Sequence, residues 1–477
     1  MVGERIPTGV EGLDELIGGG FQKGSLILMA GNPGTGKTTF GAQFICKGAS
    51  ELNEVGVYVS FAEDKKTFFH NVQNHLGRDC EKCRNKDKCK FLELVTVKEE
   101  GVSTVLESIL AEVERAEAKR LVIDSFSAMI QALEKPIEAR IILHTFIGKI
   151  VRQLGCTILL MCEIPVGESR IGLGMEEFVS DGVILLSSDE LDGRLFRDLE
   201  IRKLRGTALP ERKALFTLSG GFKVFQPFKV KPVEKPERFK PLPDPPAKFS
   251  TGSTFLDRIL DGGYPKGSMV LVEVDEHVST LQYHLIISPA CWNFLAKGRP
   301  VMVLPSTGVD HKIVKKRVME GGFTEEELNR LVRVCTCIPV GTAKEPYPVK
   351  IGGEKMEEDY QHYVKIESRL MKETGQPLIH VIGADTLLAY YGLEAEMKTL
   401  NLHATRTREK GNLCIVILKP GYTELSKLIG AMADVHLKIT REHGVLILYG
   451  VKPRTGLHIV EMDASKGHPL PQLTPII

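Results

Sequence analysis

The sequence lacks an excess of charge of either sign, because 62 lysines and arginines stand against 61 aspartates and glutamates, a net charge of +1. No overall field that would attract nucleic acid or an anionic membrane is therefore expected. Long apolar runs are also missing, since stretches such as 157–162 have the length of a strand and not of a membrane span. The first residues contain no apolar signal core. These absences predict a cytoplasmic protein with no membrane partner.

Cysteine is too sparse for a disulfide scaffold, with ten residues in a chain of 477. A chain of this length is too long for one ordinary hydrophobic core, so two domains are expected.

A glycine-rich motif, Gly-Asn-Pro-Gly-Thr-Gly-Lys-Thr-Thr, occupies 31–39 and fits the pattern G-x-x-x-x-G-K-[ST]. A buried strand is predicted before it and a helix after it, which is the context that a phosphate-binding loop requires. The glycines let backbone N–H groups approach a phosphate, Lys37 supplies a positive charge, and the Thr38 hydroxyl completes a Mg²⁺ shell. The predicted phosphate-binding residues are Gly31, Asn32, Pro33, Gly34, Thr35, Gly36, Lys37, Thr38 and Thr39. The motif predicts a nucleotide site that holds ATP and Mg²⁺.

Strands and helices alternate after this motif. Apolar runs at 55–61, 120–125 and 156–162 predict strands, while the spacing of apolar residues over 102–113 and 137–154 predicts helices. Regular alternation of this kind is typical of an α/β fold with a mostly parallel sheet and helices on both faces. Ligands in such sheets bind at the carboxyl ends of the strands.

The second half of the chain repeats the first. Residues 227–248 contain seven prolines, a composition that is not expected to contribute to a core and that predicts a semi-rigid linker, with a docking peptide as the alternative. Beyond them, 251–271 align without a gap on 8–28 at a shift of 243, with ten identities in 21 positions. The same shift places 274–281 (Val-Asp-Glu-His-Val-Ser-Thr-Leu) at the glycine-rich motif, without its glycines or lysine. We therefore predict a duplication in which the second copy has lost the phosphate loop.

The motifs together resemble the KaiC/RadA branch of the RecA-like ATPases. They comprise Thr-Gly-x-x-x-Leu-Asp at 8–14, the glycine-rich loop, Val-Ile-Asp-Ser at 122–125, Glu-Glu-Phe-Val-Ser-Asp-Gly at 176–182 and Lys-Leu-Arg-Gly-Thr at 203–207. The tandem layout is more similar to KaiC than to RadA. The resemblance implies two RecA-like domains, an ATPase domain over 1–226 and a degenerate KaiC-like domain over 249–477, joined by the linker over 227–248.

The resemblance also implies roles for single residues. Asp124 resembles the carboxylate that holds the Mg²⁺ shell, and Glu163 matches a position that senses the γ-phosphate. Members of the family usually carry Phe-Glu-Glu after the second strand, where this chain has Phe-Ala-Glu-Asp at 61–64. Because Ala62 replaces the first glutamate, the orientation of the attacking water is assigned to Glu63, with help from Asp64. The substitution leaves slow turnover open.

Lys203 and Arg205 lie one residue apart on a predicted strand, so that both side chains share a face. The resemblance implies that this pair reaches the γ-phosphate of a neighbouring subunit and acts there as a catalytic finger. The predicted catalytic residues are therefore Lys37, Glu63, Lys203 and Arg205. The resemblance also implies a homo-oligomeric ring, and a hexamer in particular. Lys452-Pro453-Arg454 stands in the corresponding region of the second half.

A cysteine cluster falls outside the family pattern. Cys80, Cys83 and Cys89 lie in a lysine-rich insert, with His75 five residues upstream of the first. Basic neighbours favour the thiolate, and a tetrahedral Zn²⁺ site would need His75 or another cysteine as the fourth ligand. Zinc, an iron–sulfur cluster and a redox disulfide all stay open.

Three functions fit these observations. The first is an ATPase that hydrolyses ATP between the subunits of a ring, with the second domain as a regulatory surface for an unknown protein partner. The second is a DNA recombination mediator of the RadA-paralogue kind, with DNA contacted by residues 166–174. The third is a scaffold that binds ATP without hydrolysing it.

Overall fold

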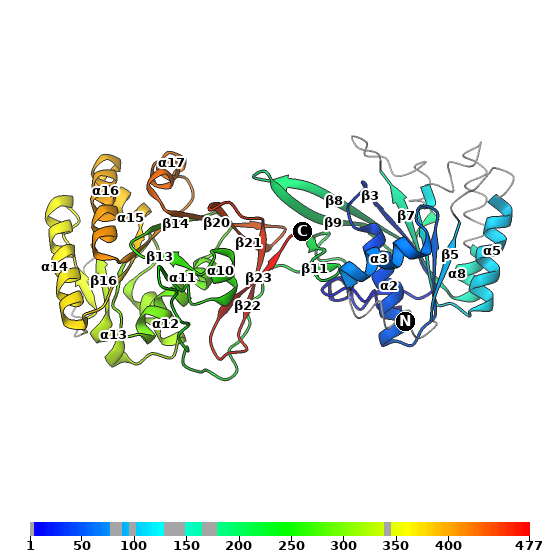
Figure 1. The fold of residues 1–477 in the computed structure, drawn as a ribbon, viewed down its shortest axis with the longest axis horizontal. Helices are drawn as coiled ribbons and strands as arrows, with labels where there is room; N and C mark the ends of the chain where they lie inside the picture. The colour runs from blue at the N-terminus through cyan, green and yellow to red at the C-terminus, as the bar shows by residue number, and fades with distance from the viewer. Residues whose placement is uncertain (1–3, 77–87, 95–101, 128–147, 165–178, 338–344) are drawn as a thin grey trace. The chain divides into compact units, whose positions relative to one another are not determined.

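The computed structural model describes residues 4–76, 88–94, 102–127, 148–164, 179–337 and 345–477. They form two compact units, unit 1 with Met1–Pro227 and Pro475–Ile477, and unit 2 with Phe228–Thr474. Each unit has a mostly parallel sheet with helices on both faces (Figure 1), which confirms the predicted α/β fold class. No helix among the described residues is long and apolar enough to cross a bilayer.

The elements of unit 1 follow the predicted alternation. Its strands are β1 (Arg5–Ile6), β2 (Phe21–Gln22), β3 (Leu26–Gly31), β4 (Gly56–Ser60), β5 (Cys89–Glu93), β6 (Arg120–Asp124), β7 (Thr157–Glu163), β8 (Gly182–Leu191), β9 (Arg194–Leu204), β10 (Lys213–Thr217) and β11 (Lys223–Phe225). Its helices are α1 (Leu13–Leu16), α2 (Lys37–Glu51), α3 (Lys65–Leu76), α5 (Val102–Arg115) and α8 (Gly148–Leu154). The helix predicted over 137–154 is described only from Gly148 onward.

The main sheet of unit 1 has the order β11-β10-β9-β8-β3-β7-β6-β4-β5, with β3 to β8 parallel and β9 to β11 antiparallel. Alternate residues of β3 enter different cores, because side chains alternate along a strand. Ile27 packs on the side of α2 and α3, whereas Leu28 packs on the side of α5 and α8. Because β3, β7 and β6 are parallel, their carboxyl ends meet at one edge of the sheet, where the glycine-rich loop begins.

Unit 2 has the same plan. Its strands are β12 (Lys248–Phe249), β13 (Tyr264–Pro265), β14 (Met269–Val274), β15 (Val301–Leu304), β16 (Val332–Thr336), β17 (Pro348–Lys350), β18 (Ile379–Gly383), β19 (Leu413–Leu418), β20 (Val435–Glu442), β21 (Val445–Lys452), β22 (His458–Asp463) and β23 (Leu470–Pro475). Its helices are α10 (Thr254–Ile259), α11 (Thr280–Ala296), α12 (His311–Glu320), α13 (Glu325–Leu331), α14 (Met356–Thr374), α15 (Ala384–Tyr391), α16 (Leu393–Lys410) and α17 (Thr423–Met432).

The duplication extends from the sequence to the topology. The order β21-β20-β14-β19-β18-β15-β16 in unit 2 repeats β9-β8-β3-β7-β6-β4-β5 in unit 1. The two entry motifs also fold alike: Asp14 Oδ1 accepts from Thr8 Oγ1 at 2.7 Å, and Asp257 Oδ1 accepts from Thr251 Oγ1 at 2.6 Å. Thr-Gly-x-x-x-Leu-Asp is thus a structural motif, in which the aspartate accepts a hydrogen bond from the threonine and fixes the backbone before the first parallel strand.

The linker segment, residues 227–248, packs along unit 2 from Phe228 onward. Apart from Lys248 it contains no helix or strand, as its prolines predict, but the expectation that it contributes nothing to a core is wrong. Phe239 is buried against Trp292, and Arg238 forms two hydrogen bonds with Glu327 at 2.7 and 3.0 Å. Gly322 allows this close approach, because a Cβ there would lie 2.7 Å from the Arg238 Cα. One buried aromatic residue, Phe239, is enough to bring this segment into the core of unit 2 despite the composition around it.

Candidate functional site

The phosphate loop of unit 1 joins β3 to α2. Gly34 and Gly36 have φ angles of 78° and 97°, a left-handed conformation that side chains disfavour. Gly31 needs its missing side chain for a different reason, since a Cβ would lie 2.6 Å from the Leu186 carbonyl oxygen. Gly36 also caps α2 without any side-chain hydrogen bond, so the first N–H groups of the helix stay available to an anion.

Lys37 is folded back over the loop and is only 7% exposed. Its ammonium donates to the carbonyl oxygens of Gly31 at 2.8 Å and Asn32 at 2.9 Å. Burial lowers the pKa of Lys37, while the negative charges of Glu163 and Asp124 oppose that shift. A buried cation beside open backbone N–H groups fits a phosphate.

Asp124 ends β6 beside the start of α2. Its Oδ2 accepts from the Thr38 hydroxyl at 2.7 Å and from the Tyr58 hydroxyl at 2.6 Å. Burial and the charge of Asp124 raise the pKa of Tyr58 well above its usual value, so Tyr58 remains a donor. The hydroxyl and carboxylate that were predicted to serve Mg²⁺ thus lie in direct contact. A hard oxygen pair at the edge of the phosphate loop suits that cation.

Glu63 follows β4 at the same edge of the sheet. The Ser60 hydroxyl holds its backbone, accepting from the Glu63 N–H at 3.0 Å and donating to the Glu63 carbonyl at 2.9 Å. Glu63 Oε2 is buried and has no hydrogen-bond partner among the described residues. A buried carboxylate oxygen without a donor is costly unless a water or a ligand completes it, so Glu63 fits the position of a water-orienting group.

The structure shows Asp64, which is predicted to help Glu63, as a helix cap, and its catalytic help stays a prediction. Its Oδ1 accepts from the Thr67 N–H at 2.9 Å and its Oδ2 from the Thr67 hydroxyl at 3.0 Å. Asp64 therefore caps the first turn of α3, and these hydrogen bonds lower its pKa. Ala62 is exposed and offers no polar group. Of the three residues after Phe61, only Glu63 is placed to act on a ligand.

Glu163 lies at the end of β7, in register with Gly31. Its charge acts on Lys37, and its backbone N–H donates to the Ser127 hydroxyl at 2.9 Å. The residue therefore stands beside the phosphate loop, and its role as a γ-phosphate sensor stays a prediction.

Lys203 and Arg205 lie at the opposite edge of the sheet, where the parallel strand β8 begins. Lys203 pairs with Val183 near the start of β8, and its ammonium donates to the Ser180 carbonyl at 2.7 Å. Arg205 forms an ion pair with Asp181 at 3.2 Å and is 59% exposed. Because strand rise is about 3.3 Å per residue, Lys203 stands roughly 10 Å along the sheet from Gly31. The structure does not bring this pair to the phosphate loop of the same chain.

Two further side chains hold the loop: Asn32, which belongs to the predicted motif, and Arg197, which the sequence motifs do not include. Asn32 Nδ2 donates to the Ile164 carbonyl at 2.9 Å. Arg197 on β9 is almost buried, and it donates to the Gly34 carbonyl at 3.1 Å and to the Ile477 carbonyl at 2.7 Å. No local motif marks Arg197, because its partners lie far away in the sequence.

The cysteine cluster falls largely outside the described residues. Cys80 and Cys83 lie there, and so does the side chain of His75. Cys89, at the start of β5, is disulfide-bonded. Within the described residues, no group of three or more potential ligands could hold a metal, so zinc gains no support there.

The fold and this site define a P-loop nucleotide-binding protein of the RecA-like class, and comparison with known proteins narrows the class. The family model described as KaiC, of an ATPase family, matches residues 6–227. The one described as GvpD basic region 2 matches residues 238–319.

Similar proteins cover one unit or both. Protein GvpD2 of Halobacterium salinarum is 27% identical, over 96% of this chain and 94% of its own length. A UPF0273 protein of Thermotoga maritima is 33% identical, over 45% of this chain and 93% of its own length. A KaiC-like protein of Pyrococcus horikoshii with a crystal structure is 37% identical, over 47% of this chain and 99% of that one, with a TM-score of 0.42. The chain belongs to the KaiC-like ATPase family, which confirms the resemblance drawn from its motifs.

Proposed function

We propose that this protein binds ATP with Mg²⁺ at the phosphate loop of unit 1 and hydrolyses it between the subunits of a ring, of which a hexamer is the favoured form. The position of Lys203 and Arg205 carries this proposal. Both side chains reach toward 180–181, at the edge of the sheet opposite the phosphate loop. They serve a phosphate only if that phosphate belongs to another subunit.

The residues of unit 1 supply the remaining groups. Lys37 and the open N–H groups of α2 hold the phosphates, while Thr38 and Asp124 hold the metal. A bound Mg²⁺ would neutralise negative charge on the phosphate oxygens. Glu63 orients the attacking water through its unpartnered Oε2, and Glu163 senses the γ-phosphate beside Lys37. Arg205 of the neighbouring subunit neutralises the charge that develops in the transition state.

Unit 2 has a regulatory or partner-binding role in this proposal. Lys452 donates to the Ala433 carbonyl at 2.6 Å, the same contact that Lys203 makes with Ser180 at 2.7 Å. By sheet register Lys452 is the counterpart of Lys203, so Arg454 is the counterpart of Arg205. Retention of this pair supports a role for unit 2 at subunit contacts. Its protein partner is unidentified.

A subunit-mixing experiment tests the shared site. Lys37→Ala removes the phosphate site and leaves the finger, whereas Arg205→Ala does the reverse. Each variant alone should lose about 1,000-fold in ATP hydrolysis, because a finger arginine contributes that much or more. Mixed subunits should regain activity, because a Lys37→Ala subunit can donate its Arg205. The double variant mixed with Lys37→Ala should stay inactive, and Arg454→Ala should change hydrolysis little.

Molar mass measured by light scattering, with and without ATP, accompanies the assay. Mixed oligomers that form without regaining activity would contradict the shared site. Hydrolysis stimulated by DNA, with a steep salt dependence, would favour the recombination-mediator alternative. Tight ATP binding without turnover would favour the scaffold.

A further inference from the structure

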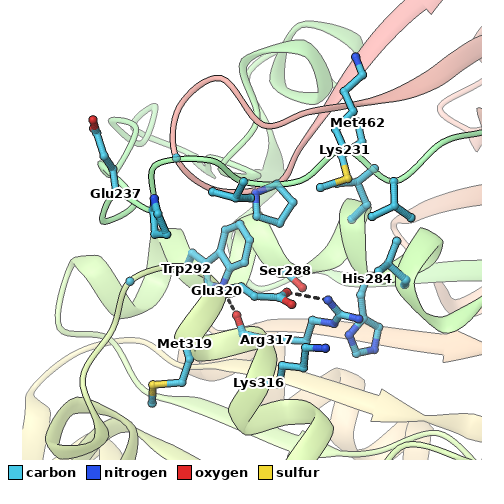
Figure 2. Close-up of a pocket in the computed structure, with 18 of the residues that line it drawn as sticks. Lys231, Glu237, His284, Ser288, Trp292, Lys316, Arg317, Met319, Glu320 and Met462 are labelled. Carbon is cyan, nitrogen blue, oxygen red and sulfur yellow. Dashed lines mark hydrogen bonds and ion pairs between the residues drawn. The ribbon is translucent and has the colours of Figure 1, made fainter.

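One feature that the nucleotide site leaves unexplained is a cavity of about 710 Å³ in unit 2. The linker segment forms one wall, and α11 and α12 form the other (Figure 2). Volumes of this size are typical of small-molecule sites. The linker therefore packs on unit 2 and also lines a cavity that is large enough to bind a small molecule.

The apolar part of the cavity lining is largely aliphatic. Leu281 and Leu285 come from α11, Met319 from α12, Met462 from β22 and Val233 from the linker. Methionine side chains adapt their shape to different apolar ligands. Trp292 also lines the cavity, but its ring is only 1% exposed and its Nε1 donates to the Arg317 carbonyl at 2.9 Å. The wall suits a flexible aliphatic body better than a stacked base.

Three polar side chains with unused hydrogen-bonding capacity face this apolar space. Ser288 is only 8% exposed, and neither its hydroxyl nor the His284 ring has a hydrogen bond to a described residue. Burial and the charge of Arg317 lower the pKa of His284 to about 3, so the ring is neutral at neutral pH. Arg317 Nε is buried and has no hydrogen-bond partner within the part of the chain that the structure describes, although Nη1 donates to Glu320 at 2.6 Å.

These groups meet because His284 and Ser288 are four residues apart on α11, on one helix face, and α12 brings Arg317 to them (Figure 2). Lys231 and Lys316 are exposed around the same cavity and form no ion pair with a described residue. Buried donors without partners are costly, and an anionic group is what an unpartnered guanidinium N–H and a hydroxyl would bind.

We infer that unit 2 binds a small amphipathic anion in this cavity, with its carboxylate or phosphate at Arg317, Ser288 and His284 and its aliphatic body along Leu281, Leu285 and Met319. The inference does not depend on ATP binding by unit 1. It assigns a ligand site to the unit that has lost its phosphate loop.

The only tryptophan of the chain, Trp292, lines this cavity, so its fluorescence reports binding directly. We would titrate the full chain with decanoate and with decyl phosphate, below their micelle concentrations, and repeat the titrations by calorimetry. Both probes should bind saturably, and the tighter of the two identifies the headgroup. Decanol, which has the body without the charge, and inorganic phosphate, which has the charge without the body, should bind at least about tenfold more weakly.

Two variants with opposite expected effects complete the test. Arg317→Gln should weaken decanoate binding about tenfold or more, because it removes a charged hydrogen bond. Glu320→Gln should tighten it, since it removes the carboxylate that competes for Arg317. Arg330→Gln, on α13 and away from the cavity, is the matched control and should leave binding unchanged.

Equal binding of decanol and decanoate would overturn the inference, and so would unchanged decanoate affinity in both Arg317→Gln and Glu320→Gln. Displacement of decanoate by ATP from the Lys37→Ala chain would also overturn it, because the cavity would then be a nucleotide site. Loss of ATP binding in unit 1 leaves all of these measurements interpretable.

Discussion

Units 1 and 2 share one sheet topology and differ at each position that handles phosphate. By the shift of 243 and the sheet register, the counterparts of Lys37, Thr38 and Asp124 are Thr280, Leu281 and Gly383. The scaffold therefore tolerates complete loss of the chemistry. What holds the fold together, such as the Asp14 and Asp257 motifs, is separate from what binds the nucleotide.

The first turns of α2 and α11 show the difference most clearly. In α2, the capping residue Gly36 makes no side-chain hydrogen bond. In α11, the Gln282 side chain accepts from the Ser279 N–H at 2.7 Å, as in a capping box. Unit 2 satisfies its own helix end, whereas unit 1 leaves that end for a ligand. An uncapped, glycine-rich helix start is thus the structural mark of the site.

The largest expected effect on ATP binding comes from removing the lysine of the phosphate loop. Lys37→Ala should weaken ATP binding about 100-fold or more, because a buried cation that contacts phosphate is lost. Thr280→Ala, at the equivalent position of unit 2, should change ATP binding little. Calorimetry of both variants checks the pair, and equal losses would mean that unit 2 also binds ATP.

The next effect separates binding from turnover within unit 1. Glu63→Gln should lower hydrolysis about 100-fold or more and leave ATP affinity nearly unchanged, since it removes the group that orients water. Asp64→Asn tests the neighbouring carboxylate, which caps α3, and should lower thermal stability more than turnover. Comparable loss of turnover in both variants would refute the assignment of separate roles.

A smaller effect is expected at Arg197, whose counterpart in unit 2 is Leu446 by sheet register. Arg197→Leu should weaken ATP binding roughly three- to tenfold, because one hydrogen bond to the phosphate loop is removed and its geometry loosens. Equilibrium binding with and without Mg²⁺ measures this change. Unchanged affinity would show that the Gly34 contact plays no part in shaping the loop.

The smallest effect concerns the pH dependence of unit 2. Glu396 is buried, its carboxylate oxygens accept no hydrogen bond from a described residue, and burial raises its pKa from 4.5 to about 8. Because the folded state holds this proton more tightly, its contribution to stability is full below pH 4.5 and is lost as the pH rises through about 8.

Urea unfolding followed by Trp292 fluorescence, at about pH 6 and about pH 9, measures how the stability of unit 2 changes with pH. The midpoint should fall at the higher pH, and Glu396→Gln should remove most of the fall. An equally steep fall in the variant would assign the pH dependence to other groups.

Much of the fold could be predicted from the sequence because its signals are local. Apolar runs placed β4, β6 and β7 to within a residue or two of their observed bounds. Asp64 shows the limit of such local signals, because an aspartate before a helix serves equally well as a cap or as a catalytic group. Only the position of Thr67 decides between them.

By itself, the sequence determined the phosphate loop, the duplication and the loss of the second loop, because spacing and identity along the chain are sufficient for each. Only the tertiary structure decided which distant groups meet. It placed Lys203 and Arg205 at the edge opposite Lys37, brought Arg197 to Gly34, and folded the linker over α11 and α12 to enclose the cavity. These outcomes depend on strand order and on contacts between residues far apart in the chain, which local patterns do not encode.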